Sequence, residues 1–405
     1  MNESTCQRRL LSPARAGGLR KTLRALVAGT AFVACTSSLP AAQASDTAPK
    51  FRSLHDFTWG ADGAWPAGNL VADKDGSLYG TTSAGGPNGA GTIFKLATDG
   101  SLTAIHSFNG LDGNLPMSGL LKGPHGTFYG VTEIGGKYGA GNVYQLTKDG
   151  VLTSLYEFGA YAGDGWNPVC DLAWGPHGEL VGTTVNGGAN GFGTVFQVTL
   201  DGKETLLHSF SSGADGRYPA AGVVVDAAGN LYGTTHNAND GSSGTAYKID
   251  AQGVFSVLHT FDDASGFFPH AALTLDADGN LYGTTEAGGA YANGTVFKLT
   301  PAGTHSVLYA FTGGADGSTP VAPLYRDKVG NLVGTTSWGG QGYHGTIFTL
   351  APDGKLTTLY TFDGATGNNA MAGLVRDPEG GVPAIYGTTY SGGANGAGVI
   401  YRLKK

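Results

Sequence analysis

A tripeptide, Gly-Thr-Thr or a near match, recurs seven times along this chain of 405 residues. Successive copies lie 50 to 53 residues apart, and they begin at Gly80, Gly130, Gly182, Gly233, Gly283, Gly334 and Gly387. A period of this length indicates an array of small structural units, each of which packs against the next. The repeat therefore constrains the fold more than any other feature of the sequence.

Each copy of the repeat contains four short hydrophobic segments, for example Val223–Val225, Leu231–Thr235, Val257–Phe261 and, in the next copy, Gly294–Leu299. β-Branched and aromatic residues alternate within them, and Gly, Asn, Asp or Pro residues separate them, which is typical of strands and turns. Four short antiparallel strands per unit of about 50 residues predict an all-β fold, namely a β-propeller with four-stranded blades.

The fourth segment of the repeat ends in the motif Leu-(His or Tyr)-x-Phe or a close variant. Its seven copies end at Phe57, Phe108, Phe158, Phe210, Phe261, Phe311 and Phe362. Because the first copy precedes the first set of the other three segments, we predict that Phe51–Phe57 pairs with Val399–Leu403 and completes the seventh blade. This closure would remove free sheet edges, which otherwise favour aggregation. We predict one seven-bladed propeller domain over residues 51–405.

The first 44 residues are typical of a signal peptide. Basic residues precede an apolar stretch, Leu26–Cys35, which is shorter than the roughly 18 residues of a transmembrane helix. Cleavage after the small-residue site Ala42–Ala44 would leave a short linker, residues 45–50, before the propeller. We therefore expect a secreted or periplasmic protein. Phe32–Cys35 resembles a loose lipobox, and lipidation of Cys35, which would make an outer-membrane lipoprotein, is the alternative.

The composition of the mature chain limits how it can be stabilised and which partners it can bind. Cleavage at Ala44 would leave Cys170 as the only cysteine, so no disulfide could form within the chain and stability must come from a large core. The formal net charge is −7 and no basic stripe is present, which argues against a nucleic-acid partner. We expect a monomer with no transmembrane segment after cleavage.

The repeat resembles the GloVer tandem repeat family of exported bacterial proteins over residues 51–405. The resemblance is carried by Asp278–Thr285, by the double glycine Gly288-Gly289 and by Gly294–Leu299. It implies an exported propeller and brings no established chemistry with it. The double glycine is also similar to kelch repeats, but their Tyr and Trp positions do not follow here.

A propeller of this kind has one face with tight turns, such as Asp278–Asn280, and an opposite face with longer loops. Asp73–Gly76 resembles part of a calcium loop, but the further oxygen ligands and the distant Glu are absent, so we interpret it as a turn. The longer loops join the second strand to the third and the fourth strand to the next first strand. We expect ligands to bind on this long-loop face.

Three polar residues of blades 4 and 5 replace chemically less reactive residues of the repeat on that face: His236, His270 and Glu286. We predict that they are neighbours, with Arg217 and Tyr218 beside them. If the protein is an enzyme, His or Tyr would act as the base and Arg, or a divalent metal held by the His and Glu side chains, would supply a positive charge.

Aromatic and amide residues are also dense on the long-loop face. The predicted ligand-binding residues are Trp65, Glu133, Trp166, Asn167, Phe268, Trp338, Tyr343 and Tyr390. Large exposed rings usually mark an interface or a binding groove. The competing interpretation is that these rings pack between blades as part of the core.

Two functions follow from these residues. The first is binding, without catalysis, of a glycan or of a cell-surface or extracellular protein. The second is a carbohydrate-active enzyme, either a polysaccharide lyase or a glycoside hydrolase, with the His and Glu site of blades 4 and 5. The sequence contains no nucleophile-elbow, zinc-protease or phosphate-loop motif in a suitable context, which favours the first function.

Overall fold

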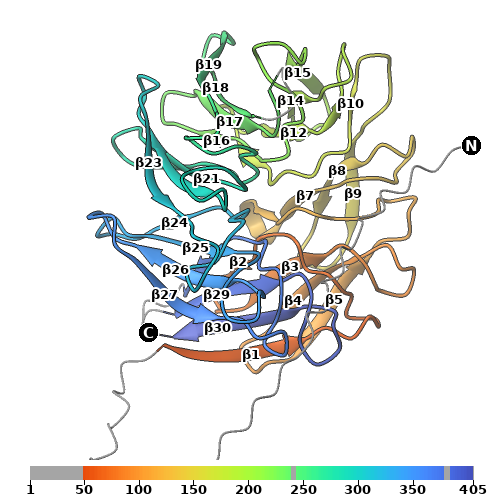
Figure 1. The fold of residues 1–405 in the computed structure, drawn as a ribbon. Helices are drawn as coiled ribbons and strands as arrows, with labels where there is room; N and C mark the ends of the chain where they lie inside the picture. Colours follow the sequence, from red (N-terminus) through yellow and green to blue (C-terminus); the bar gives the residue numbers. More distant parts are fainter. Residues whose placement is uncertain (1–48, 239–242, 378–383, 405) are drawn as a thin grey trace, which may run out of the picture. The chain divides into compact units, whose positions relative to one another are not determined.

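Seven four-stranded antiparallel sheets form the described part of the chain, which in this computed structural model comprises residues 49–238, 243–377 and 384–404. The predicted signal peptide, its cleavage site and Cys35 lie outside these residues. Figure 1 looks onto the ring of sheets, whose colours run from orange through yellow and green to blue. The predicted seven-bladed propeller is confirmed. None of the described helices is long and apolar enough to span a membrane.

The strands of blades 1 to 7 repeat in the same order. The first strands are β2 (Val71–Ala72), β6 (Leu121–Lys122), β11 (Ala173–Trp174), β16 (Val224–Val225), β20 (Thr274–Leu275), β24 (Tyr325–Arg326) and β28 (Val375–Arg376). The second strands are β3 (Leu78–Thr82), β7 (Phe128–Thr132), β12 (Leu180–Thr184), β17 (Leu231–Thr235), β21 (Leu281–Thr285), β25 (Leu332–Thr336) and β29 (Ala384–Thr389). The first strand is therefore the shortest of each blade.

The outer half of each blade is longer. The third strands are β4 (Thr92–Leu96), β8 (Asn142–Leu146), β14 (Thr194–Val198), β18 (Thr245–Ile249), β22 (Thr295–Leu299), β26 (Thr346–Leu350) and β30 (Val399–Lys404). The fourth strands are β5 (Leu102–Ser107), β9 (Leu152–Glu157), β15 (Glu204–Ser209), β19 (Phe255–Thr260), β23 (His305–Ala310), β27 (Leu356–Thr361) and, in blade 7, β1 (Lys50–Asp56). Two further strands, β10 (Gly165–Trp166) and β13 (Asn186–Gly187), pair outside the blades, and Pro124–Gly126 forms a short 3-10 turn.

The ring closes where β1 pairs with β30. Their register runs antiparallel from Lys50 opposite Lys404 to Asp56 opposite Val399, with one irregularity. In Figure 1 the red β1 lies against the blue β30, so the sheet of blade 7 combines segments from both ends of the described chain. The predicted closure of the seventh blade is confirmed.

The core consists of seven hydrophobic clusters, each of which joins one blade to the next. Between blades 1 and 2, for example, Tyr79 and Ile93 pack with Phe128 and Tyr144. The cluster between blades 7 and 1 shows why the Gly-Thr-Thr motif begins with glycine, because a Cβ atom on Gly80 would lie 2.6 Å from the ring of Phe94 in that cluster. The repeat therefore encodes how adjacent strands and blades fit together.

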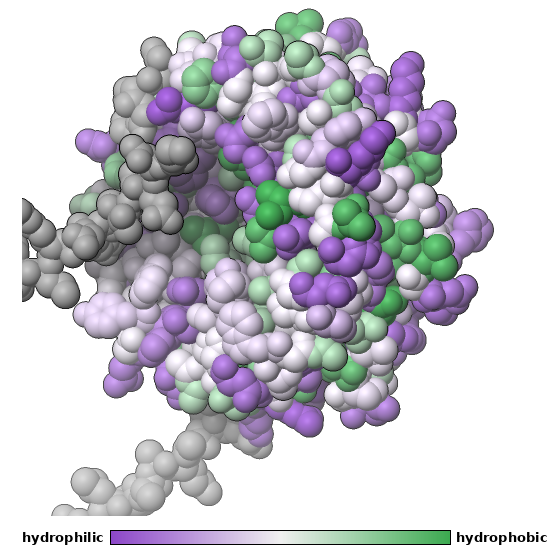
Figure 2. All heavy atoms as spheres, turned by 90° about the vertical axis from the view of Figure 1, so that its right-hand side faces the viewer, coloured by the Kyte–Doolittle hydropathy of each residue, from purple (hydrophilic) through white to green (hydrophobic). Residues whose placement is uncertain are grey.

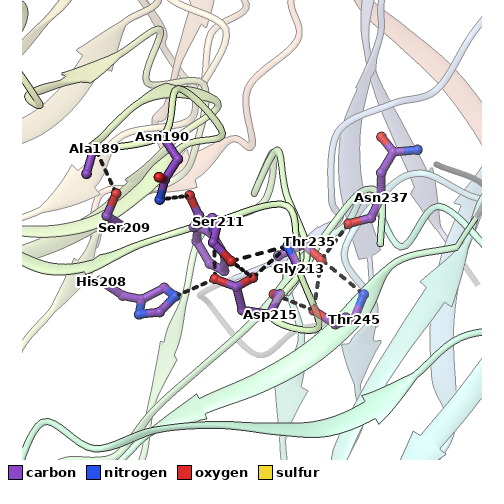
Figure 3. Close-up of polar contacts among 11 residues, drawn as sticks. Ala189, Asn190, His208, Ser209, Ser211, Gly213, Asp215, Thr235, Asn237 and Thr245 are labelled. Atoms are coloured by element: carbon purple, nitrogen blue, oxygen red, sulfur yellow. Dashed lines mark hydrogen bonds and ion pairs between the residues drawn. The ribbon is translucent and has the colours of Figure 1, made fainter. Parts of the chain in front are cut away.

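The threonines of the same motif fasten the long loops to the blades. In blade 4, Thr235 Oγ1 lies 2.8 Å from Thr245 Oγ1 and donates to the carbonyl of Asn237 at 3.1 Å. Thr245 Oγ1 in turn donates to the carbonyl of Asp215 at 3.2 Å. These contacts, drawn in Figure 3, hold the two connections of the long-loop face against each other. Equivalent threonine pairs occur in blades 1, 3, 5 and 6.

An aspartate orders the connection that follows the fourth strand. Asp215 accepts hydrogen bonds from the backbone and hydroxyl of Ser211 and from His208 Nε2, the last at 3.2 Å (Figure 3). His55 and His106 make the equivalent contacts in blades 7 and 1, at 2.9 and 3.0 Å. These histidines support the turn by contacting the aspartate, which also caps its own turn.

Candidate functional site

The long-loop face is built from two connections per blade, which we call the d–a connection (fourth strand to next first strand) and the b–c loop (second to third strand). They pair with each other across one short bridge in each blade, for example Arg217 with Asn237 and Phe267 with Ala287. In blade 3 the bridge extends to the two-residue ladder of β10 and β13. Side chains from both connections are therefore displayed at fixed positions.

One equivalent position in every d–a connection, the one before the proline or its counterpart, has a left-handed backbone with φ between 55° and 61°. These seven residues are Trp65, Leu115, Asn167, Tyr218, Phe268, Thr319 and Asn369. Six of them precede a proline. Residues other than glycine rarely adopt this backbone conformation. Because the strain recurs in all seven blades, it belongs to the architecture and does not by itself mark a site.

The left-handed residue is held by hydrogen bonds to two blades. The N–H of Tyr218 donates to the carbonyl of Phe192 in blade 3 at 2.9 Å, and its own carbonyl accepts from the N–H of His236 at 3.1 Å. In the same way, the carbonyl of Phe268 accepts from the N–H of Glu286 at 3.1 Å. His236 and Glu286 therefore occupy equivalent, rigidly supported positions in adjacent blades.

The structure brings His236, Glu286 and His270 together, as the sequence predicts. His236 Nε2 lies 3.7 Å from Glu286 Oε2, and the rings of His236 and His270 are 5.9 Å apart at a steep angle. Phe268 stacks on His236 with centroids 4.7 Å apart and planes 7° apart, and His236 Nδ1 lies 2.9 Å from Asn237 Oδ1. The imidazole of His236 therefore has Glu286 and Asn237 at its two nitrogens and the ring of Phe268 on one face.

The three ionisable side chains of this cluster have pKa values that are shifted in different directions. Burial acts to lower the pKa of His236, but the carboxylate of Glu286 and the amide oxygen of Asn237 outweigh it, so the pKa of His236 is raised. The imidazole of His236 beside it lowers the pKa of Glu286 despite the burial of the carboxylate. Burial, and then the charge of His236, lower the pKa of His270. The carboxylate of Glu286 therefore favours the protonated form of His236, whereas the surroundings of His270 favour its neutral form.

Arg217 and Tyr218 form a pair of their own next to this cluster. The guanidinium carbon of Arg217 lies 5.4 Å from the centre of the Tyr218 ring, and Arg217 Nη1 is 3.4 Å from Ser212 Oγ. Arg217 Nε is buried without a hydrogen-bond partner among the described residues. Arg217 is bridged to Asn237, so the pair is anchored one position from His236.

The three candidate ligands do not make a metal-binding group. Among residues 49–238, 243–377 and 384–404, no three His, Cys, Asp or Glu side chains are arranged to hold a metal ion. His236, His270 and Glu286 are neighbours through one ion pair and one ring contact rather than around a common point. The geometry therefore offers acid–base groups and no evident metal centre in the part of the chain described.

Some of the predicted ligand-binding residues are partly structural. Trp65 packs against the core cluster between blades 7 and 1, stacks on Tyr390 with centroids 5.5 Å apart, and contacts Trp59 edge to face at 4.6 Å. Asn167 donates to the carbonyl of Glu133 at 3.2 Å, and burial raises the pKa of the Glu133 carboxyl. The core-packing interpretation thus holds in part for Trp65, while Trp59 at 45% exposure is open to solvent.

The exposed aromatic side chains share one location. Every Phe, Tyr or Trp that is exposed in the described part of the chain lies in a b–c loop or a d–a connection. They are Trp59, Tyr138, Tyr161, Trp166, Tyr291, Trp338 and Tyr343. Trp59, Tyr138, Tyr161 and Tyr291 are not among the ligand-binding residues predicted above. Trp59 and Tyr161 were missed because, in the d–a connections, only the two positions before the proline were compared between blades.

His270 also lines a cavity of about 230 Å³ at the centre of the ring, to which all seven blades contribute. The residue that follows the proline position supplies one lining side chain per blade: Ala67, Met117, Val169, Ala220, His270, Val321 and Met371. His270 is the single ionisable side chain among these seven. It therefore links the cluster of blades 4 and 5 to the central channel.

Asn69 and Asp171 form a polar pair within this channel that was not predicted from the sequence. The amide of Asn69 donates to the carboxylate of Asp171, whose other oxygen accepts from the N–H of Gly119 at 2.6 Å, and Gly373 N–H donates to Asn69. Burial raises the pKa of Asp171. The sequence does contain a signal for this pair: Asn69 and Asp171 stand at the position where the other five blades have Gly, Ala or Pro.

Comparison with known proteins identifies the repeat and the fold. A model of the Gloeobacter/Verrucomicrobia repeat matches residues 42–173, 161–337 and 275–405. The extracellular domain assigned to a one-component system of B. thetaiotaomicron is 14% identical with a TM-score of 0.58; the match covers 88% of this chain and 40% of that one. A protein assigned as a 6-phosphogluconolactonase from Bacteroides fragilis is 18% identical with a TM-score of 0.50, over 80% and 92% of the two chains.

These structural likenesses concern the propeller fold alone, since the identities are low. The chain spans less than half the length of the B. thetaiotaomicron domain. No curated protein matches the chain in sequence.

Proposed function

The chain belongs to the Gloeobacter/Verrucomicrobia repeat family, and from this premise we propose that it is an exported propeller that binds a glycan, without catalysis, on its long-loop face. Export is supported by the signal-like N-terminal sequence. It is further supported by the similarity of the fold to an extracellular domain.

One observation carries the proposal: the exposed aromatic side chains of the described residues all lie on one face. An exposed ring is unfavourable in water unless a partner covers it, and seven rings on a single face are more than isolated surface residues explain. The flat faces of Trp and Tyr suit the C–H faces of sugar rings, while the Asn side chains and loop backbone between them suit hydroxyl groups.

A glycan fits this face better than a large protein interface does. The rings are spread over blades 1, 2, 3, 5 and 6 and are separated by glycine and polar residues, whereas the centre of a protein interface is a continuous apolar area. Figure 2 shows the side of the ring that lies to the right in Figure 1, where hydrophobic residues form small groups between hydrophilic ones. A chain of sugar units can contact such separate rings one after another.

An array of polysaccharides and oligosaccharides, probed with the purified propeller, tests the proposal. We expect the wild-type protein to bind at least one glycan, and Trp338→Ala with Tyr343→Ala to weaken that binding about tenfold, since both rings are close to half exposed or more. Leu200→Ala is the matched control, because Leu200 is exposed in a tight turn of the opposite face. Wild-type binding to proteins but to no glycan would contradict the proposal.

Carbohydrate-active catalysis is the second candidate function, and the cluster of blades 4 and 5 favours it. A neutral His270 beside the His236–Glu286 ion pair could accept a proton α to a carboxylate, with Arg217 as the cation that holds that carboxylate. If this function is correct, His270→Ala or Glu286→Gln should lower turnover of an acidic polysaccharide by roughly 10²- to 10⁴-fold. Glycan binding that persists in both variants, without turnover by the wild type, would exclude catalysis on the polysaccharides tested.

A further inference from the structure

An open cavity of about 450 Å³ lies on the long-loop face of blade 3, away from the cluster of blades 4 and 5. It has the size of a small-molecule site. Its lining residues are Tyr161, Ala162, Gly163, Asp164, Trp166, Asn186, Gly187, Gly188 and Gly191. The cavity therefore combines two aromatic side chains with an amide and a backbone surface made largely of glycines.

The sequence of blade 3 explains why the cavity forms there. Pro168 follows Phe158 by ten positions, whereas the equivalent residues of the other blades are eight or nine positions apart. The longer d–a connection carries Tyr161 and Trp166, which are 49% and 54% exposed. Gly163 and Gly191 contribute no side chain, and a Cβ atom at either would meet no other atom within 4 Å, so the space beside the rings stays open.

The aromatic and amide groups are held in place before any ligand arrives. Trp166 lies directly opposite Asn186 in the ladder of β10 and β13, which puts both side chains on the same side of that ladder. The amide nitrogen of Asn186 donates to Asn167 Oδ1 at 3.1 Å. Tyr161 Oη donates to Glu204 Oε2 at 3.1 Å. A preorganised site of this kind loses little entropy on binding.

The charges around the cavity select against an anionic ligand. Asp164 is buried, and its carboxylate accepts from the hydroxyl of Tyr156 and from two backbone N–H groups. Glu204 lies behind Tyr161. None of the nine lining residues carries a positive charge. A uronate or sulfate group would therefore approach two carboxylates with no cation among the described lining residues to balance them.

From this arrangement we propose that the blade 3 cavity binds one neutral pyranose unit of the glycan. The sugar ring stacks on Trp166 with Tyr161 at its edge, and the amide oxygen of Asn186 accepts a hydrogen bond from a sugar hydroxyl. This inference rests on the proposed function and gives it a substrate class, namely an uncharged oligosaccharide. An amino-acid side chain of a protein partner could enter the same space, and the experiment below distinguishes that occupant from a sugar.

Calorimetric titration of the whole propeller with two groups of hexasaccharides tests the inference. The neutral group contains cellohexaose, xylohexaose and mannohexaose, and the acidic group contains oligogalacturonate and oligo-alginate. We expect wild-type binding to at least one neutral hexasaccharide and an affinity about tenfold lower in Trp166→Ala and in Tyr161→Ala. Tyr161→Phe keeps the ring but loses the contact with Glu204, so its loss should be smaller, about two- to fivefold.

Leu200→Ala is again the matched control, because Leu200 is 43% exposed but lies in a tight turn of the opposite face. Its affinity should equal that of the wild type, and thermal melting should show that all variants are folded. Binding that survives Trp166→Ala and Tyr161→Ala but is lost in Trp338→Ala and Tyr343→Ala would overturn the blade 3 site and leave the proposed function standing. Wild-type binding to acidic sugars alone would overturn the neutral class. Absence of binding to any saccharide would overturn both.

Discussion

The imidazole rings of His259 and His305 are stacked, with centroids 4.2 Å apart and planes 5° apart. They come from the fourth strands of blades 4 and 5, β19 and β23. In each ring Nε2 is buried without a hydrogen-bond partner among the described residues. The d–a connection that follows β19 has Ser265 where most other blades have the aspartate, so His259 lacks the carboxylate that His208 contacts in Asp215.

This pair should make the protein sensitive to acid. Burial, and then the charge of His259, lower the pKa of His305 to about 4, while an unfolded histidine titrates near 6.5. As the pH falls from about 6.5 to 4, the unfolded chain therefore binds protons that the folded chain does not, and stability is lost. Asp262 opposes this shift without cancelling it.

The substitution His305→Phe should weaken that dependence. Phe255 and Phe51 occupy the equivalent position of two other blades and stack on His208 and Tyr360, so the ring is compatible with the fold. We expect the fall in Tm between pH 7 and pH 5 to be smaller in the variant by about 2 °C or more. Identical pH profiles of Tm would show that the stacked pair does not control acid stability.

Removal of residues 51–57 should sharply destabilise the ring. The deletion takes away the strand that pairs with β30 and leaves exposed edges on a sheet that has no other partner there. We expect aggregation or a fall in Tm of about 10 °C or more, measured by light scattering during thermal melting. A chain that starts at residue 50 is the control, and equal melting of the two proteins would contradict closure by β1.

The substitution Asp215→Ser should destabilise blade 4, because Asp215 caps its connection and contacts His208. Ser265 shows that the repeat tolerates serine at this position. Loss of the carboxylate should lower the free energy of unfolding by about 1–3 kcal/mol, measured by urea denaturation. Asp353→Ser is the control, since Asp353 is exposed in a tight turn and accepts one bond from the backbone of Lys355. Equal losses in both variants would refute a special role for Asp215.

The substitution Asp171→Gly should remove the contact that crosses the channel from blade 3 to blades 1 and 2. The N–H of Gly119 and the amide of Asn69 would lose their acceptor, which predicts a loss of about 1–3 kcal/mol in the free energy of unfolding. In a double-mutant cycle with Asn69→Gly the two losses should not add, because both residues belong to one network. Additive losses would show that the two residues act independently.

The fold could be predicted from the sequence because seven copies of one pattern give the same evidence seven times. The spacing of Gly-Thr-Thr and the early copy of the fourth segment were sufficient to place β1 beside β30. The b–c loop has the same length in every blade, ten positions from the last Thr of the second strand to the first residue of the third. This constant length allowed His236 and Glu286 to be compared by position. They are neighbours in the structure, as predicted, and their direct contact at 3.7 Å is a finding of the structure.

Other parts of the site depend on three-dimensional packing that no local pattern records. Trp65 looks like an exposed ligand-binding ring in the sequence, yet it packs on a core cluster because the blade 7 loop brings Tyr390 against it. Asn69 and Asp171 are 102 positions apart and meet only because the ring brings their blades together. The blade 3 cavity arises from one extra residue in a loop, whose effect on shape the repeat does not encode.

The threonine contacts of the long-loop face have a consequence for how such proteins can diversify. Thr235, Thr245 and their counterparts fix each loop pair through their own hydroxyls and backbone carbonyls. The threonine hydroxyls contact backbone carbonyls of the loops, so this attachment does not depend on which side chains the loop residues carry. A blade can therefore carry Trp166 and Asn186 or another pair, such as Arg217 and Asn237, at the bridged positions and keep the same threonine contacts. Recombination between repeats could in this way generate new recognition surfaces while the underlying scaffold is inherited unchanged.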